Sequence, residues 1–184
     1  SLNHAGSALT AADIDSDGDR DLIVTDTSDA RLLLLLNDGR GRFAESPNSL
    51  PVGGRGVVVF NNGQAQQLLH LSEPPMLYTI ADGRLHLAKR LAFDGTPSCA
   101  ATLDADGDGD LDLFIGGGSS LGQFPVAAPS QLFLYDNGSY TGSPLAKAGI
   151  VTGCATGDMD SDGDADLVLS CEWGSIRLLL NEGG

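Results

Sequence analysis

The sequence predicts an all-β protein built from small antiparallel sheets that repeat along the chain. Glycine accounts for 25 of the 184 residues, and many of these glycines separate short runs of Leu, Val and Ile, which is typical of short strands joined by tight turns. A motif of alternating aspartates also occurs three times. Because 41% of the residues are apolar, the chain can bury a hydrophobic core.

The repeated motif is D-x-D-x-D-G-D-x-D-L, and its copies span residues 13–22, 104–113 and 158–167. Each copy leads into an apolar strand, then a second strand, then a turn that contains Gly. In the first copy, Ile23 and Val24 lead to Leu32–Leu36 and then to Asn37-Asp38-Gly39. Self-similarity at a fixed spacing predicts one structural unit used several times.

A degenerate unit is predicted between the first two copies, because these begin 91 residues apart, about twice a period of about 45. Val57–Phe60 leads to Asn61-Asn62-Gly63, and two further strands are predicted at Leu68–Leu71 and Met76–Ile80, before the turn Asp82-Gly83. This unit has asparagines but no aspartate array in its loop. We therefore expect no tightly bound metal there.

Four units of three or four antiparallel strands at this period are typical of β-propeller blades, and a solenoid is the less favoured alternative. We expect a single β-propeller domain or fragment over residues 1–184, with units at about 7–45, 55–90, 98–142 and 150–184. Four units fit a small complete propeller, a partial or open one, or a half that pairs with another chain. An open blade edge would favour strand addition from a partner or a second copy.

The aspartate motifs are predicted to bind calcium, because Ca²⁺ takes six to eight oxygen ligands and so needs several carboxylates that converge. Positions one, three and five supply side chains, the glycine at six permits a sharp turn, position seven offers its carbonyl and position nine closes the shell. We expect about three Ca²⁺ ions. The candidate ligands are Asp13, Asp15, Asp17, Asp19, Asp21, Asp104, Asp106, Asp108, Asp110, Asp112, Asp158, Asp160, Asp162, Asp164 and Asp166.

An EF-hand is excluded, because its loop requires a Glu at position twelve and helices on both sides. Position twelve here is Val24, Ile115 or Leu169, each within a predicted strand. Magnesium fits poorly because it demands a smaller octahedron and keeps its waters.

The net charge of −15, with only ten Lys and Arg residues, argues against nucleic-acid binding, which depends on basic side chains. The longest apolar run, Leu32–Leu36, is far too short to insert into a membrane. Because useful calcium concentrations occur outside the cytosol, we expect an extracellular or cell-surface protein, either secreted or periplasmic.

The cysteines and histidines say less about disulfide bonding and catalysis. Cys154 and Cys171 flank the third motif and either form a disulfide across paired strands or remain buried free thiols, and Cys99 stands apart from both. No nucleophile motif accompanies any of the three histidines, so we expect no catalytic residue. These histidines are His4, His70 and His86.

The three motif copies and their following strands resemble the FG-GAP/VCBS repeats of integrin-α-like propellers, in which this loop joins adjacent strands of a blade and binds Ca²⁺. Residues 171–178 and 116–134 further resemble secreted propellers of the cartilage-acidic-protein, ASPIC/UnbV-associated group. A Phe-Gly…Gly-Ala-Pro signature is missing, and the last unit lacks a final outer strand.

The resemblance implies a non-enzymatic, calcium-stabilised scaffold that binds a protein or carbohydrate ligand or acts in adhesion. One alternative is a subunit of an extracellular filament or ring that assembles through open blade edges. Another is a propeller-type glycosidase or lyase. The Gly/Pro/Ser-rich insertion Gly116–Ser130 is predicted to be a surface loop, and it offers Phe124 as a candidate ligand contact. Trp173 is the second candidate, although a lone Trp in such a turn more often packs between blades.

Overall fold

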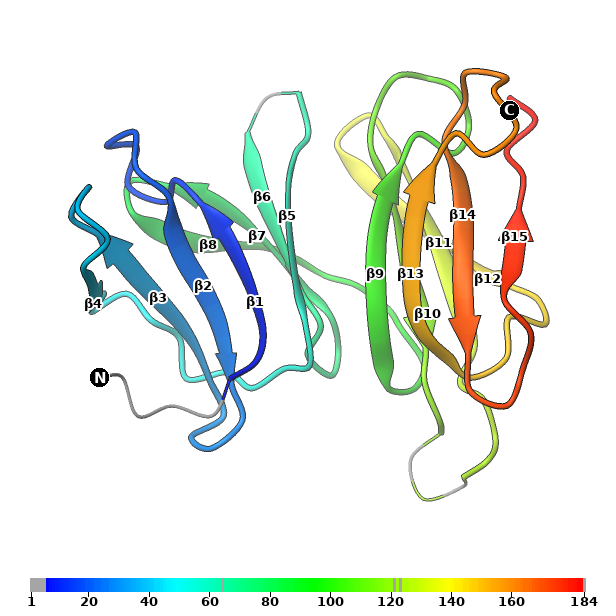
Figure 1. Cartoon of the computed structure of the whole chain (residues 1–184), viewed down its shortest axis with the longest axis horizontal. Coiled ribbons are helices and arrows are strands. Elements are labelled where there is room, and N and C mark those ends of the chain that lie inside the picture. The colour runs from blue at the N-terminus through cyan, green and yellow to red at the C-terminus, as the bar shows by residue number, and fades with distance from the viewer. Residues whose placement is uncertain (1–5, 64, 121, 123, 184) are drawn as a thin grey trace. The chain divides into compact units, whose positions relative to one another are not determined.

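The computed structural model describes residues 6–63, 65–120, 122 and 124–183. These residues form fifteen strands and no helix, which confirms the all-β prediction. The chain divides into two compact units, residues 1–90 (unit 1) and 91–184 (unit 2), and each contains two antiparallel sheets (Figure 1). In the part of the chain that the structure describes, no helix is long and apolar enough to cross a membrane.

Unit 1 holds two four-stranded sheets, and within each sheet every strand pairs antiparallel with its neighbour in sequence, as in a propeller blade. The first sheet consists of β1 (Gly6–Ala12), β2 (Asp21–Asp26), β3 (Arg31–Asn37) and β4 (Phe43–Glu45). The second consists of β5 (Val57–Asn61), β6 (Gln66–His70), β7 (Met76–Ala81) and β8 (Arg84–Arg90).

Unit 2 repeats this connectivity. Its first sheet consists of β9 (Pro97–Leu103), β10 (Asp112–Gly117), β11 (Ser130–Asp136) and β12 (Ser139–Leu145). Its second sheet has three strands among the described residues, namely β13 (Val151–Gly157), β14 (Asp166–Cys171) and β15 (Arg177–Leu179). The four sheets therefore confirm the predicted blade-like units.

Each unit has its own apolar core between its two sheets. In unit 1, Ile23 and Leu34 of the first sheet join Leu68 and Ile80 of the second in one buried cluster. In unit 2, Phe114 of the first sheet packs in the same cluster as Leu167 and Leu169 of the second sheet. Burying a Leu, Ile or Phe side chain contributes about 1.5–3 kcal/mol, so the repeated leucine runs stabilise the packing of sheet on sheet.

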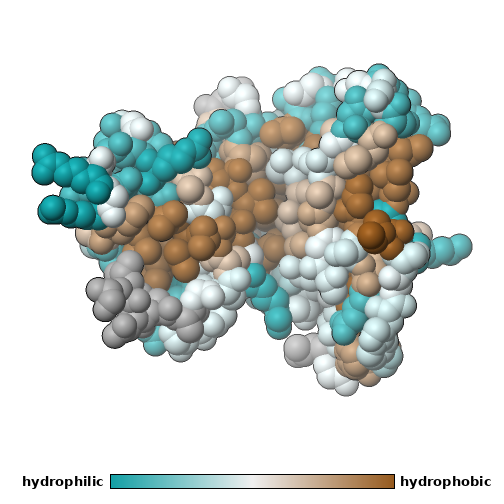
Figure 2. All heavy atoms as spheres, in the orientation of Figure 1, coloured by the Kyte–Doolittle hydropathy of each residue, from teal (hydrophilic) through white to brown (hydrophobic). Residues whose placement is uncertain are grey.

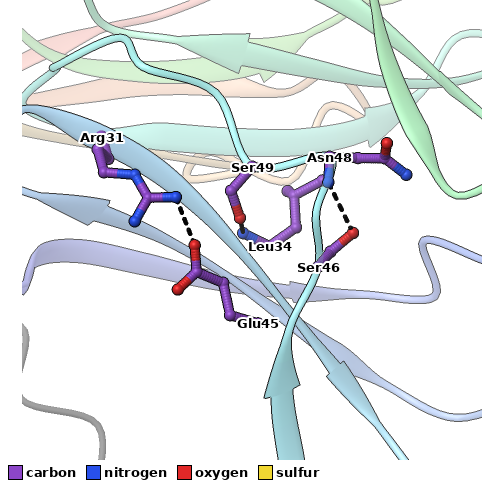
Figure 3. A network of polar contacts seen from close by, with 6 residues as sticks. All are labelled: Arg31, Leu34, Glu45, Ser46, Asn48 and Ser49. Carbon is purple, nitrogen blue, oxygen red and sulfur yellow. Dashed lines mark hydrogen bonds and ion pairs between the residues drawn. The ribbon is translucent and has the colours of Figure 1, made fainter.

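The segment after β4 is fastened along the edge of β3 (Figure 3). The Ser46 amide donates to the Leu34 carbonyl at 2.8 Å, and the Leu34 amide donates to Ser49 Oγ at 3.0 Å. An ion pair joins Arg31 to Glu45. Because β4 is only three residues long, these contacts satisfy edge groups of β3 that would otherwise be open to another strand.

Both ends of the predicted surface loop Gly116–Ser130 belong to strands. Gly116 and Gly117 belong to β10, and Ser130 begins β11. Ala128 is buried, with 2% of its surface exposed. A Cβ added at Gly117 would lie 2.2 Å from the Ala128 carbonyl oxygen, so glycine here permits close backbone approach rather than flexibility.

All three cysteines are free, and the register of the β13–β14 ladder does not suit the alternative of a Cys154–Cys171 disulfide. In the β13–β14 ladder Cys154 lies opposite Leu169, whereas Cys171 lies opposite Val151. Such diagonal neighbours are about 7–8 Å apart, and a disulfide needs Cβ atoms about 3.5–4.5 Å apart.

Candidate metal sites

The three aspartate motifs occupy the same connection in three of the four sheets. They join β1 to β2, β9 to β10 and β13 to β14. Position one follows the last residue of the first strand, and position nine is the first residue of the second strand. In unit 2 both loops lie at one end of the sheets (Figure 1), and Figure 2 shows hydrophilic residues at the end that carries the β13–β14 loop.

The three loops share one backbone conformation, which the motif spacing dictates. Position four has φ between 64° and 75° (Ser16, Gly107 and Ser161), and position six has φ between 90° and 103° (Gly18, Gly109 and Gly163). A Cβ at any of the position-six glycines would meet nothing within 4 Å. Glycine is therefore needed at position six for its torsion angle and not for space.

The aspartate at position one holds this turn together. Its Oδ2 accepts a hydrogen bond from the position-six glycine amide, at 3.1 Å for Asp13, 3.0 Å for Asp104 and 3.1 Å for Asp158. In the second and third loops its Oδ1 also accepts from the position-four amide, at 2.8 and 2.6 Å. These bonds draw the turn around the carboxylate.

Carboxylate oxygens of three aspartates converge in each loop. One oxygen from each of three aspartates lies within 4.8 Å of the other two, and the three groups are Asp13, Asp15 and Asp17; Asp104, Asp106 and Asp108; and Asp158, Asp160 and Asp166. Positions one, three and five meet in the first two loops, whereas positions one, three and nine meet in the third.

Two oxygens of the converging carboxylates point to a cation. Asp13 Oδ1 and Asp106 Oδ1 are buried and have no hydrogen-bond partner among the described residues. A buried carboxylate oxygen without a donor is costly, and a cation removes that cost. Oxygen-only groups of this kind suit a hard ion such as Ca²⁺, so the residues present fit the ion that the motif predicts.

The electrostatics of the loops are unfavourable without a counter-ion. Desolvation, together with the charges of Asp17 and Asp21, raises the pKa of Asp15. Desolvation and the charge of Asp162 raise the pKa of Asp160 in the same way. Two unit charges 4.8 Å apart repel by about 1 kcal/mol in water and about 3.5 kcal/mol at an effective dielectric constant of 20.

Position nine has a second task that the sequence interpretation missed. Asp21, Asp112 and Asp166 are fully buried. Their Oδ2 atoms accept from the position-two amide at 2.7–2.8 Å. Their Oδ1 atoms accept from an amide at the end of the third strand or just beyond it, also at 2.7–2.8 Å. Each carboxylate thus ties the loop and the second strand to the third strand, and burial raises the pKa of Asp112.

Position seven lies outside the three groups of converging oxygens. The backbone amides of Asp19, Asp110 and Asp164 each donate to Oδ1 of position five at 2.9 Å. The Asp19 side chain is turned toward Gly39, where an added Cβ would lie 2.4 Å from Asp19 Oδ2. That position seven offers its backbone carbonyl to the ion stays a prediction.

The neighbouring sheet of the same unit supports two of the loops. In unit 2 the Asn181 amide side chain donates to the Asp104 carbonyl at 3.0 Å. In unit 1 the turn between β7 and β8 lies beside the first loop, since a Cβ at Gly83 would be 3.5 Å from Asp15 Cβ. The turn between β5 and β6 has Asn62 in place of an aspartate, and the Asn62 amide donates to the Ala65 carbonyl at 3.1 Å.

The two histidines that the structure describes lie on different strands, β6 and β8, of the same sheet. His4 lies outside the described residues, and His86 is exposed on β8. His70 on β6 is fully buried, and neither ring nitrogen has a hydrogen-bond partner among the described residues. Burial lowers its pKa to about 4.

The aromatic candidates form a pair on the surface of unit 2. The rings of Phe124 and Trp173 meet edge to face with their centroids 5.0 Å apart and an interplanar angle of 70°. Trp173 is 76% exposed and Phe124 is 55% exposed. The expectation that Trp173 packs between blades is therefore wrong, because its ring is largely exposed at a turn residue with φ of 57°.

Residues 104–169 match a family model described as FG-GAP-like repeat. No match was found among the curated proteins. Among solved structures, the chain is similar to one described as BBS1N in complex with ARL6DN, soaked with lead, with 12% sequence identity and a TM-score of 0.49. That alignment covers 100% of this chain and 69% of the other.

Proposed function

We propose that each of the three aspartate loops binds one Ca²⁺ and that the chain is an extracellular, calcium-stabilised binding or adhesion scaffold rather than an enzyme. The observation that carries this proposal is the convergence of three carboxylates in every loop, with Asp13 Oδ1 and Asp106 Oδ1 buried and unpartnered among the described residues. The FG-GAP-like match over residues 104–169 supports it, because repeats of this kind typically form scaffolds.

The bound ion would raise the free energy of unfolding of the chain. It would offset the carboxylate repulsion and link the end of the first strand to the start of the second. Calcium at 100 times its dissociation constant adds about 2.7 kcal/mol per site to the free energy of unfolding. Unit 1 carries one loop and unit 2 carries two, so we expect unit 2 to gain about 5.4 kcal/mol, twice the gain of unit 1.

The same ion requirement leads us to place the protein outside the cytosol, where calcium is abundant.

For the ligand, a protein or a glycan, we propose a contact surface centred on Phe124 and Trp173, because both rings are exposed and pack against each other. Trp173 is the only tryptophan in the sequence, so its fluorescence reports directly on ligand binding. Ligand screening by fluorescence, with Trp173→Ala as the negative control, tests this surface.

Thermal unfolding tests the calcium proposal. Melting temperatures are compared in EGTA, in millimolar Mg²⁺ and in millimolar Ca²⁺ for the wild type and for Asp15→Asn, Asp106→Asn and Asp160→Asn. We expect a rise specific to Ca²⁺ that becomes smaller in each variant, while Asp29→Asn, an exposed aspartate outside the motifs, keeps the full rise. Equal melting temperatures in Ca²⁺ and EGTA would contradict the proposal.

A further inference from the structure

We propose that Cys99 and Cys154 form a disulfide that joins the two sheets of unit 2 when the chain meets a small-molecule disulfide oxidant. Cys99 lies on β9 and Cys154 on β13, the first strands of the two sheets. Both side chains are half-buried at the margin of the same apolar cluster, which includes Ala101, Phe114 and Leu169. This pairing is independent of the metal loops.

The two strands lie close enough for direct contact between their side chains. Further along the same strands, Thr156 Oγ1 donates to the Thr102 carbonyl at 3.3 Å. Both cysteine side chains pack against the same buried residues of unit 2. Gly116 on β10 leaves space for Cys99, because a Cβ at this position would lie 2.7 Å from Cys99 Sγ. The two thiols therefore face one cluster from neighbouring strands, and the backbone at Gly116 leaves room for Cys99.

The surroundings of the two thiols shift their pKa values in opposite directions. The hydrogen bond from Cys154, together with those from Ser98 and the Gly116 backbone, lowers the pKa of Cys99. The pKa of Cys154 is raised, because its thiol donates that hydrogen bond to Cys99 and is partly desolvated. Cys99 is thus the thiolate that attacks an oxidant, since the thiolate is the nucleophile in disulfide exchange.

The reaction with oxidised glutathione balances without a further reagent. Cys99 Sγ⁻ attacks one glutathione sulfur, the glutathione disulfide bond breaks, and one glutathione thiolate leaves. Cys154 then loses its proton to that thiolate and attacks Cys99 Sγ, which expels the second glutathione. Two protein thiols are oxidised, and one glutathione disulfide is reduced to two glutathione thiols.

Cys171 provides an internal control in the same unit. Its thiol donates to the Ala148 carbonyl at 3.1 Å, and its ladder partner is Val151. We expect it to stay reduced while the other two cysteines react.

Peptide mapping after incubation with oxidised glutathione tests the proposal, with reduced glutathione as the control. Endoproteinase Asp-N cleaves before aspartate and separates the cysteines into peptides 94–103, 136–157 and 166–184. We expect 94–103 linked to 136–157 and one free thiol per chain. Cys171→Ser should keep the link, and Cys99→Ser and Cys154→Ser should lose it.

The crosslink should also stabilise unit 2. It closes a loop of 55 residues, and constraining the unfolded chain in this way lowers the unfolding equilibrium constant by about a thousandfold. Three free thiols after oxidation, a link that includes 166–184, or only mixed disulfides with glutathione would overturn the proposal. The wild-type map decides between these results even if a serine variant does not fold.

Discussion

Replacing Asp112 with asparagine should destabilise unit 2 even when no calcium is present. The buried carboxylate accepts from the Tyr135 amide at 2.7 Å and from the Ala105 amide at 2.8 Å. Asparagine keeps one acceptor and turns an NH₂ group toward the other backbone amide. A hydrogen bond to a charged group contributes about 1.5–3 kcal/mol, and the unpartnered buried amide adds to that loss. We therefore expect a loss of about 3 kcal/mol, roughly a hundredfold in the unfolding equilibrium constant.

Urea unfolding in excess EGTA measures this loss. The matched control is Asp110→Asn in the same loop, because the only hydrogen bond of Asp110 within the motif comes from its backbone amide. We expect the control to change the free energy of unfolding by less than about 0.5 kcal/mol. If Asp112→Asn were no more destabilising than Asp110→Asn in EGTA, position nine would not tie the loop to the third strand.

Two further predictions concern parts of the fold away from the metal loops. His70 has a pKa of about 4 in the folded protein against about 6.5 unfolded, so its contribution of about 3 kcal/mol is present above pH 6.5 and is lost as the pH falls toward 4. Urea unfolding from pH 4 to 7.5 should show a weaker pH dependence for His70→Leu than for the wild type or His86→Leu, and equal slopes would refute this. Gly117→Ala should cost more than about 2 kcal/mol, because its Cβ would lie 2.2 Å from a backbone oxygen. Gly118→Ala, whose Cβ would be 3.4 Å from its nearest neighbour, should cost far less, and similar losses in the two variants would contradict the close packing at Gly117.

The repeated units and their apolar strands were predictable because one local pattern recurs. The motif fixes a turn between two strands, and the leucine runs that follow must be buried. The outer strand β12 was harder to foresee, since Gly142 and Pro144 interrupt it. Gly142 nevertheless belongs in the strand, because a Cβ there would lie 2.6 Å from the Phe133 ring, and such cross-strand contacts depend on register.

The candidate metal site was predictable to a similar depth. Convergence of positions one and three follows from the loop sequence alone, and the structure shows it in all three loops. The bracing by Asp21, Asp112 and Asp166 depends on amides 15 to 23 residues away, so no local pattern reveals it. The proximity of Cys99 to Cys154 around one cluster depends on the packing of two separate sheets, which spacing along the chain does not encode.

Counting bound ions by native mass spectrometry tests the calcium account most directly. The protein is stripped with EGTA, exchanged into a volatile buffer with micromolar Ca²⁺, and compared with a variant that combines Asp15→Asn, Asp106→Asn and Asp160→Asn. We predict three Ca²⁺ ions on the wild type and none held specifically by the variant. The same ion count on both proteins would contradict the account.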